Sequence, residues 1–438
     1  MIKTKNRIIR TAIPNKKSIK IFNKLKKIEP RGMHGQFPIV WKKAKDFSVY
    51  DHLGNKFIDF SSTMLVTNIG HSNTRVITDI KKLLKKPLMH TYNYASEERL
   101  QYLNNLKSFT PSYLTKFFLL SSGSEATEAA LKLIRYNGKF NKNGKNIVLS
   151  FDGNWHGRTL GSEMMGGKEN LKKWITSRDK NIIQLPFPYP WYQGSSKKGF
   201  FIKTVNKLLK SKNLNPKKDI SGVMLESFQG WGTIFYPKQF IAELNQFCKK
   251  NDILIAFDEI QAGFGRTGKL FGYMHYDIKP DIVCCGKGAG SGYPLSLVLG
   301  HKKIMDLPKE GEMSSTHSAN PLACAIGNAT INEIRKKKLI NNASKKGELL
   351  HYELNKLKDK YPDIIRYIFG KGLVASIIFY KHLISKVNKI GDECFTNGLI
   401  VVKTGRESIK IGPPLTISVS AIKEGIAVIE KSISNNFH

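Results

Sequence analysis

Charged side chains that could do chemistry stand directly after apolar stretches of the sequence. Lys287 follows the run Ile282–Cys285 and one glycine, and it leads into a Gly/Ser-rich turn. Asp258 follows a second apolar run, and Glu226 follows a third. A carboxylate or an ammonium group at the end of a buried strand is costly unless it has a partner or a function. These three residues are therefore the first candidates for a catalytic site.

Two further segments offer features that a ligand would need. The segment Ser122–Glu125 fits a capping box and places Gly123 and Ser124 in the first turn of a helix, where free backbone N–H groups attract an anion such as a phosphate. Trp155 and His156 lie in a loop flanked by glycines, so the indole could lie flat on a planar ring. Taken alone, an ordinary capped helix and a packed tryptophan are the simpler alternatives.

Together, these residue types meet the needs of pyridoxal phosphate (PLP). A buried lysine with a lowered pKa can form a Schiff base through its neutral amine. A carboxylate that faces a pyridine nitrogen keeps that nitrogen protonated, so the ring can accept electrons from a carbanion. The helix start would hold the phosphate, and the indole would stack on the ring. We therefore predict that Lys287 carries PLP, and we predict no metal.

The elements that must position these groups alternate along the chain. Continuous apolar runs separated by amphipathic helices predict a mostly parallel sheet that is buried on both faces. In such sheets ligands bind beyond the carboxyl ends of the strands, where the candidate residues stand. The predicted strands are residues 116–120, 146–151, 222–226, 253–257, 281–285 and 295–300.

The length of 438 residues exceeds the size at which a single core stops growing, so more than one domain is expected. Residues 1–75 form an N-terminal segment with a small β-hairpin within 47–60, which we expect to pack with the C-terminal domain. Residues 76–325 form a large α/β domain that binds the cofactor. Residues 326–438 form a smaller α+β domain with helices and short strands.

The net charge of +37 comes mostly from lysines spread along the whole chain, without a known nucleic-acid-binding motif. The codon bias of an AT-rich genome explains it more simply, and a basic nucleic-acid-binding protein is kept only as a distant alternative. The five cysteines form no CxxC pair, which is typical of reduced thiols. No membrane span or secretory signal is found, so we expect a cytoplasmic protein without membrane contact.

One long segment carries a family resemblance. Residues 257–294, which contain FDEIQAGFGRTGKLFG and PDIVCCGKGAGSGYP, resemble the class III (ω-amino acid) aminotransferases of PLP fold type I. Shorter motifs, among them SSGSEATEAALKL, NWHGRTLG, ESFQG and STHSANPLACA, extend the resemblance over nearly the whole chain. The resemblance implies an α/β fold with a large PLP-binding domain and a small C-terminal domain.

The resemblance also implies roles for single residues. Lys287 looks like the lysine that carries the cofactor and acts as general base. Asp258 looks like the partner of the ring nitrogen, and Gln261 would hydrogen-bond the ring hydroxyl. Thr316 matches a residue that reaches the phosphate of the neighbouring subunit, which implies a homodimer with shared active sites. The other cofactor-binding candidates are Gly123 and Ser124 at the phosphate, Trp155 over the ring, His156 and Glu226.

Two departures from the family's pattern concern the substrates. Members that use glutamate and 2-oxoglutarate commonly have Glu where this chain has Trp231, and Arg where it has Lys410. Trp231 offers a broad apolar wall in place of a carboxylate. Arg406 lies in a nearby turn, and its planar guanidinium suits a carboxylate better than an ammonium does, although it could also be another exposed cation. Met64 completes the set of candidate substrate contacts.

These observations predict an aminotransferase that moves an amino group from an ω-amine or amino-acid donor to a keto acid, with pyruvate favoured over 2-oxoglutarate. An aminomutase or a phospholyase of the same fold is the alternative, because the absence of the usual carboxylate gate is acceptable for these reactions as well.

Overall fold

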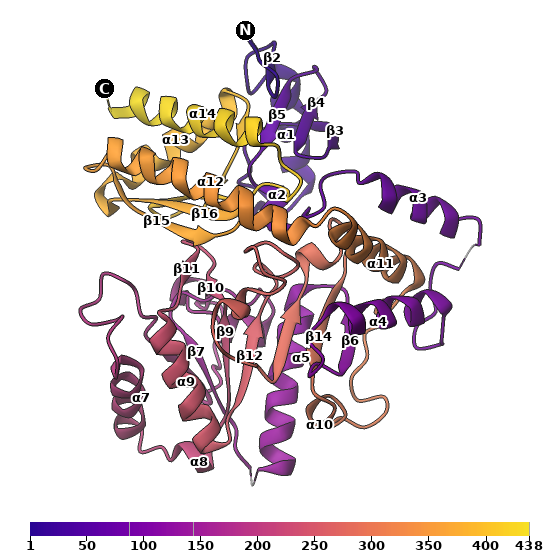
Figure 1. Cartoon of the computed structure of the whole chain (residues 1–438), viewed down its shortest axis with the longest axis vertical. Helices are drawn as coiled ribbons and strands as arrows, with labels where there is room; N and C mark the ends of the chain where they lie inside the picture. Colours follow the sequence, from indigo (N-terminus) through magenta and orange to yellow (C-terminus); the bar gives the residue numbers. More distant parts are fainter. Residues whose placement is uncertain (87, 143, 438) are drawn as a thin grey trace. The chain divides into compact units, whose positions relative to one another are not determined.

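The computed structural model describes residues 1–86, 88–142 and 144–437, and it divides into two compact units (Figure 1). Unit 1 comprises Met1–Thr74, Trp231–Thr233 and Leu339–His438, and unit 2 comprises Arg75–Gly230 and Ile234–Lys338. The boundary expected after residue 325 lies inside helix α11 (Pro321–Lys336). This helix packs against α4 (Glu97–Phe109), so it belongs wholly to unit 2.

A seven-stranded sheet forms the centre of unit 2, in the order β6-β14-β13-β12-β9-β7-β8. The five strands from β13 to β8 run parallel, whereas β14 is antiparallel to both β13 and β6. The predicted mostly parallel sheet is therefore confirmed. Its strands are β6 (Lys116–Leu120), β7 (Ile147–Phe151), β8 (Ile182–Leu185), β9 (Ile220–Glu226), β12 (Leu254–Asp258), β13 (Ile282–Cys285) and β14 (Ser296–Gly300).

The strand β8 was not among the predicted strands. It lies at the edge of the sheet, and its residues alternate between half-buried and buried. By contrast, every residue of β9 and β13 is buried. Continuous apolar runs identify central strands of a parallel sheet, but a short edge strand lacks this signal.

Helix α5 (Gly123–Tyr136) packs against the sheet of unit 2 over β9, β12, β13 and β14. Its buried face carries Ala126, Ala129 and Ala130, whose small side chains allow the helix to approach the strands closely. The first turn of the helix, with Gly123 and Ser124, lines the same cavity as Asp258 and Lys287 at the strand ends. The other helices of unit 2 are α4, α6 (Leu160–Met165), α7 (Phe200–Ser211), α8 (Pro216–Asp219), α9 (Lys238–Asn251), α10 (Lys302–Met305) and α11, and α3 (Thr74–Leu83) begins at its boundary.

Unit 1 is built from both ends of the chain (Figure 1). In its first sheet the predicted hairpin corresponds to β4 and β5, which pair antiparallel, and β17 pairs parallel with β5. The strands are β1 (Ile2–Lys3), β2 (Ile8–Ile9), β3 (Trp41–Lys45), β4 (Ser48–Asp51), β5 (Lys56–Asp59) and β17 (Leu399–Ile400). Strand β17 thus joins the first residues of the chain to its C-terminal part.

The second sheet of unit 1 has the order β15-β16-β19-β18. Its strands are β15 (Ile365–Lys371), β16 (Val374–Phe379), β18 (Val402–Lys403) and β19 (Ser408–Ile411). The helices of unit 1 are α1 (Lys16–Ile28), α2 (Ser62–Leu65), α12 (Leu339–Lys360), α13 (Ile384–Thr396) and α14 (Val419–Phe437). Among the described residues, none of the helices of either unit has the length and apolar character needed to cross a membrane.

Candidate active site

Seven of the nine predicted cofactor contacts line a single cavity of unit 2. The cavity has a volume of about 160 Å³ and lies at the carboxyl ends of β12 and β13, next to the first turn of α5. Glu226 lies outside its lining and Thr316 lies apart from it. The lining residues are Gly123, Ser124, Trp155, His156, Gly157, Asp258, Ile260, Gln261 and Lys287.

Lys287 enters the cavity from the turn that follows β13. Its φ of 41° is positive, which is rare for a residue with a side chain and costs conformational energy. Burial lowers the pKa of the Lys287 amine, while the carboxylates of Asp258 and Glu226 act in the opposite direction. A lowered pKa increases the fraction of neutral amine, which is the form that acts as a nucleophile or a base.

Asp258 is the last residue of β12, and only 5% of its surface is exposed. Its Oδ1 accepts a hydrogen bond from the backbone N–H of Ile260 at 3.0 Å. Its Oδ2 lies 2.9 Å from Nδ1 of the buried His156. Each carboxylate oxygen therefore has a partner that fixes its orientation, so the buried charge is compensated.

Glu226, the last residue of β9, forms hydrogen bonds with two residues that line the cavity. Its Oε2 accepts the backbone N–H of Trp155 at 3.0 Å, and its Oε1 accepts Nε2 of Gln261 at 3.2 Å. Burial raises the pKa of this carboxyl to about 7, against the lowering effects of His156 and of its backbone donors. Glu226 thus supports the predicted stacking residue and the predicted partner of the ring hydroxyl, without lining the cavity itself.

The first turn of α5, where the sequence predicts an anion site, lines the cavity through Gly123 and Ser124. The predicted capping box is present: Ser122 accepts from the N–H of Glu125, and the Glu125 carboxylate accepts from the N–H of Ser122. Gly157 faces this turn with a φ of 148°, and a Cβ on it would come within 2.3 Å of Ser124 Oγ. Glycine is therefore required where the loop and the helix start meet.

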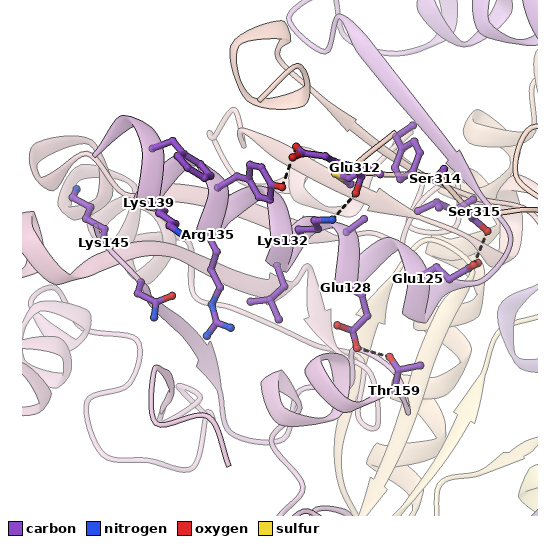
Figure 2. A pocket seen from close by; sticks show the side chains of 18 of the residues that line it. Glu125, Glu128, Lys132, Arg135, Lys139, Lys145, Thr159, Glu312, Ser314 and Ser315 are labelled. Atoms are coloured by element: carbon purple, nitrogen blue, oxygen red, sulfur yellow. Dashed lines mark hydrogen bonds between the residues drawn. The ribbon is translucent and has the colours of Figure 1, made fainter. Parts of the chain in front are cut away.

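The loop that carries Trp155 and His156 is tied to α5 by a second carboxylate. Glu128 Oε1 accepts hydrogen bonds from Thr159 Oγ1 at 2.6 Å and from the N–H of Gly161 at 2.8 Å. Figure 2 shows the Thr159 contact, together with the hydrogen bond from Ser315 Oγ to Glu125, at the wall of a larger cavity of about 1050 Å³ along α5. Side chains of this helix therefore brace the loop and the segment that precedes Thr316.

Trp155 is half-buried, and its ring has cationic neighbours. The guanidinium carbon of Arg158 lies 4.7 Å from the ring centroid, and Nζ of Lys168 lies 5.2 Å from it. Thr316 is exposed, and its carbonyl oxygen lies 2.7 Å from Nε2 of His90. The predicted role of Thr316 at a neighbouring subunit thus concerns a residue on the surface of this chain.

The four predicted substrate contacts belong to unit 1. Met64 is 52% exposed and lies in α2, where four successive residues have positive φ. Trp231 and Lys410 are both buried. The guanidinium carbon of Arg406 lies only 3.7 Å from the Trp231 ring centroid, which is a close cation–π contact. Trp231, which the sequence predicts as an apolar wall, thus also offers its aromatic face to a cation.

The cavity fits PLP by the chemistry of its residues. It combines an amine with a lowered pKa, a fixed carboxylate, and a helix start that two glycines keep open; a Cβ on Gly123 would come within 2.9 Å of Ile260. Sequence reasoning missed Gly157 and Ile260 as lining residues. The glycine flanking His156 was a usable signal for the first, whereas nothing in the local sequence indicated the second.

Comparisons with known proteins identify the family of this chain. The sequence profile of the family described as "Aminotransferase class-III" matches residues 31–433. Acetylornithine aminotransferase from Clostridium acetobutylicum is 31% identical over 411 residues, which cover 91% of this chain and 97% of that protein.

Solved structures have the same fold. An (S)-enantioselective omega-transaminase from Thermomicrobium roseum superimposes with a TM-score of 0.87 at 23% identity, covering 97% of this chain and 99% of that one. Ornithine aminotransferase from Toxoplasma gondii, described with PLP at its active site, gives a TM-score of 0.84 at 23% identity and 94% coverage of both chains.

Proposed function

This chain belongs to the class-III aminotransferases, PLP-dependent enzymes of fold type I, and on that premise we propose that it moves an amino group from an ω-amine or amino-acid donor to a keto acid, with pyruvate favoured over 2-oxoglutarate. The observation that carries the proposal is the single cavity that brings Lys287, Asp258 and the start of α5 together.

We assign the cofactor contacts as follows. When bound, PLP supplies a carbonyl that takes up the amino group and a ring that withdraws electrons from the carbon that loses a proton. Asp258 would keep the ring nitrogen protonated, and Gln261 would bind the ring hydroxyl. The N–H groups at Gly123 and Ser124 would bind the phosphate, and Trp155 would cover the ring.

Lys287 has two roles in this proposal. Its amine would hold the cofactor, and when its Nζ is free and neutral it would act as the general base that moves a proton at the reacting carbon. The lowered pKa of the amine supports both roles, since each requires the neutral form. Glu226 acts through Trp155 and Gln261, so we assign it a positioning role.

The relatives of this chain suggest which donor to test first. The relative from Clostridium acetobutylicum is an acetylornithine aminotransferase, which makes N-acetylornithine the first ω-amino donor to test. For the acceptor, our first candidate for binding the keto-acid carboxylate is Arg406, whose guanidinium lies against Trp231. The second candidate is Lys410, which stands at the position of the family's arginine. Arg406 has a half-exposed side chain, which supports its choice over the buried Lys410.

We also propose a homodimer, in which the exposed Thr316 reaches the phosphate site of the neighbouring subunit. A cytosolic location is part of the proposal as well. All five cysteines are buried and unbonded, which supports a reducing compartment.

The test is a pair of half-reactions followed by absorbance. N-acetylornithine should convert the bound cofactor to its amine form, and pyruvate added after removal of the donor should return it. A lyase or a mutase would not use a separate keto acid to return the cofactor to its aldehyde form. Failure of every keto acid to return it would therefore favour these alternative reactions.

A second measurement locates the cofactor. Borohydride reduction should attach PLP to the peptide that contains Lys287, and Lys287→Arg should abolish turnover because a guanidinium cannot replace the amine. Attachment at another lysine would contradict the assignment.

A further inference from the structure

A row of hydrogen-bonded side chains lies behind Asp258. His156 Nδ1 lies 2.9 Å from Asp258 Oδ2, and Asn154 Nδ2 lies 3.2 Å from His156 Nε2. Asn154 and His156 are almost completely buried, with 1% and 2% of their surfaces exposed. An imidazole can carry its proton on either nitrogen or on both, so the partner of each nitrogen decides the charge of the pair.

The row is anchored to the backbone through Gln229. Its Nε2 lies 2.5 Å from the carbonyl oxygen of Asp152, and a carbonyl can only accept. The same Nε2 lies 3.1 Å from Asn154 Oδ1, and Tyr189 donates its hydroxyl to Gln229 Oε1 at 3.0 Å. One orientation of the Gln229 amide satisfies all three contacts: its NH₂ group faces Asp152 and Asn154, and its oxygen faces Tyr189.

This orientation determines the proton on His156. Because Gln229 donates to Asn154, the oxygen of Asn154 faces Gln229 and its NH₂ group faces His156. An NH₂ group cannot accept a hydrogen bond, so Nε2 of His156 must be the acceptor and carry no proton. The proton is then on Nδ1, which donates to Asp258. A doubly protonated imidazolium would place two donors against each other.

We propose that Asn154 is a positioning residue that keeps His156 neutral and protonated on Nδ1, so that Asp258 retains its full negative charge for the ring nitrogen of PLP. This proposal rests on the proposed function and assigns a further residue to its site. The carboxylate of Glu226 also interacts with His156, and the amine of Lys287 lines the same cavity. The two carboxylates favour an imidazolium, and the Asn154 amide opposes it.

The charge on the pair has a consequence for the electron sink. An imidazolium bound to Asp258 would make a pair with no net charge, and the ring nitrogen would hold its proton less tightly. With a neutral imidazole the pair keeps one negative charge. Asn154 is outside the lining of the cavity, so its effect passes through His156.

The first test measures the tautomer directly in the holoenzyme. With ¹⁵N-labelled histidine, the signal of His156 among the eleven histidines is identified by its loss in His156→Gln. We expect a neutral ring with the proton on Nδ1 under the conditions of the activity assay. A ring protonated on Nε2, or an imidazolium under the same conditions, would overturn the proposal. This readout does not depend on turnover, so it separates the proposal from a failure of the proposed function.

The second test changes the partner of Nε2. Asn154→Asp supplies an oxygen that accepts from Nε2, so His156 should become an imidazolium and kcat should fall about tenfold or more. The matched control is Asn146→Asp, which adds the same charge at the exposed other end of β7 and should leave both the tautomer and kcat unchanged. If Asn154→Asp behaves like this control, Asn154 does not position His156.

Discussion

At the residue scale, Asp258 offers the sharpest test of the catalytic assignment. Asp258→Asn keeps the size of the side chain and removes its charge. PLP binding should largely persist, while transamination falls by about 100-fold or more, because the carboxylate stabilises charge that develops only during the reaction. The cofactor content is measured by absorbance and the turnover by steady-state kinetics. Near-normal turnover would mean that the carboxylate has only a structural role.

Glu226 makes a second residue-scale prediction, which concerns stability and pH. Burial raises the pKa of its carboxyl from 4.5 to about 7, so between these values the folded protein holds a proton that the unfolded chain has released. The contribution of this group to the free energy of unfolding then falls as the pH rises, by about 1.4 kcal/mol per pH unit for each such proton. Glu259, buried in the same unit, has its pKa raised to about 7 by the same cause.

The measurement is urea unfolding of the apoprotein at pH 5, 6 and 7. Glu226→Gln should reduce the loss of stability across this range by the contribution of one proton, and Glu226→Gln combined with Glu259→Gln should reduce it further. An unchanged pH dependence in the single variant would show that Glu226 has an ordinary pKa.

The residues differ in how far the sequence could predict them. Lys287 and Asp258 stand at the ends of apolar strands, so the local sequence predicts both their burial and their proposed roles. Asn154 carries no such signal. Its role depends on Gln229, which is 75 residues away in the sequence and reaches it only in the folded sheet. A contact between distant segments cannot be inferred from the local pattern of either one.

At the scale of elements, the turn between β18 and β19 carries the prediction for the keto acid. It contains Arg406, whose guanidinium lies over Trp231. If Arg406 binds the carboxylate, Arg406→Ala should raise the KM for pyruvate by tens-fold. This corresponds to the loss of about 2 kcal/mol for one charged hydrogen-bonded contact. Lys410→Ala, on the neighbouring strand β19, is the matched cation variant and should have a smaller effect.

Two results would correct this prediction in different ways. If only Lys410→Ala raises the KM, the carboxylate site has remained at the family's usual position. If the unchanged enzyme uses 2-oxoglutarate better than pyruvate, the preferred acceptor is wrong whichever cation reads it. Both measurements use the same steady-state assay with each keto acid varied in turn.

The elements themselves were predictable to different degrees. Central strands such as β9 and β13 are apolar throughout, and the capping box of α5 can be read from four residues. The edge strand β8 was missed because half of its residues are only partly buried. The extent of α11 within unit 2 was missed because its packing against α4 joins segments far apart in the sequence.

At the scale of the whole molecule, the proposed shared active site can be tested by subunit mixing. Lys287→Ala and Thr316→Ala should each be impaired alone. In a hybrid dimer, one site would lack both residues and the other would have both, since Thr316 comes from the opposite subunit. Random mixing should therefore restore about one quarter of the unmodified activity. The mixture is assayed after the subunits have exchanged, with each variant alone as control.

Mixed dimers without recovered activity would show that Thr316 serves its own subunit.

The division into units was only partly predictable at this scale. The short segment Trp231–Thr233 belongs to unit 1 through two hydrogen bonds, from Ser408 Oγ to the Trp231 carbonyl and from Thr233 Oγ1 to the Phe369 carbonyl. No change in composition marks a segment this short, so its membership of unit 1 cannot be predicted from the sequence.

The pairing of β5 with β17 has a consequence for synthesis of the chain. Ile58 pairs with Leu399, and Arg7 forms an ion pair with Glu424 at 2.7 Å. The partners of the first strands are therefore synthesised at least about 340 residues after the strands themselves. At ribosomal rates of about 5–20 residues per second, this delay is roughly 20 to 70 seconds. All of unit 2 is translated during this delay. The N-terminal sheet must therefore be kept from aggregation while its edge is unpaired, and a prematurely terminated chain would leave that edge exposed permanently.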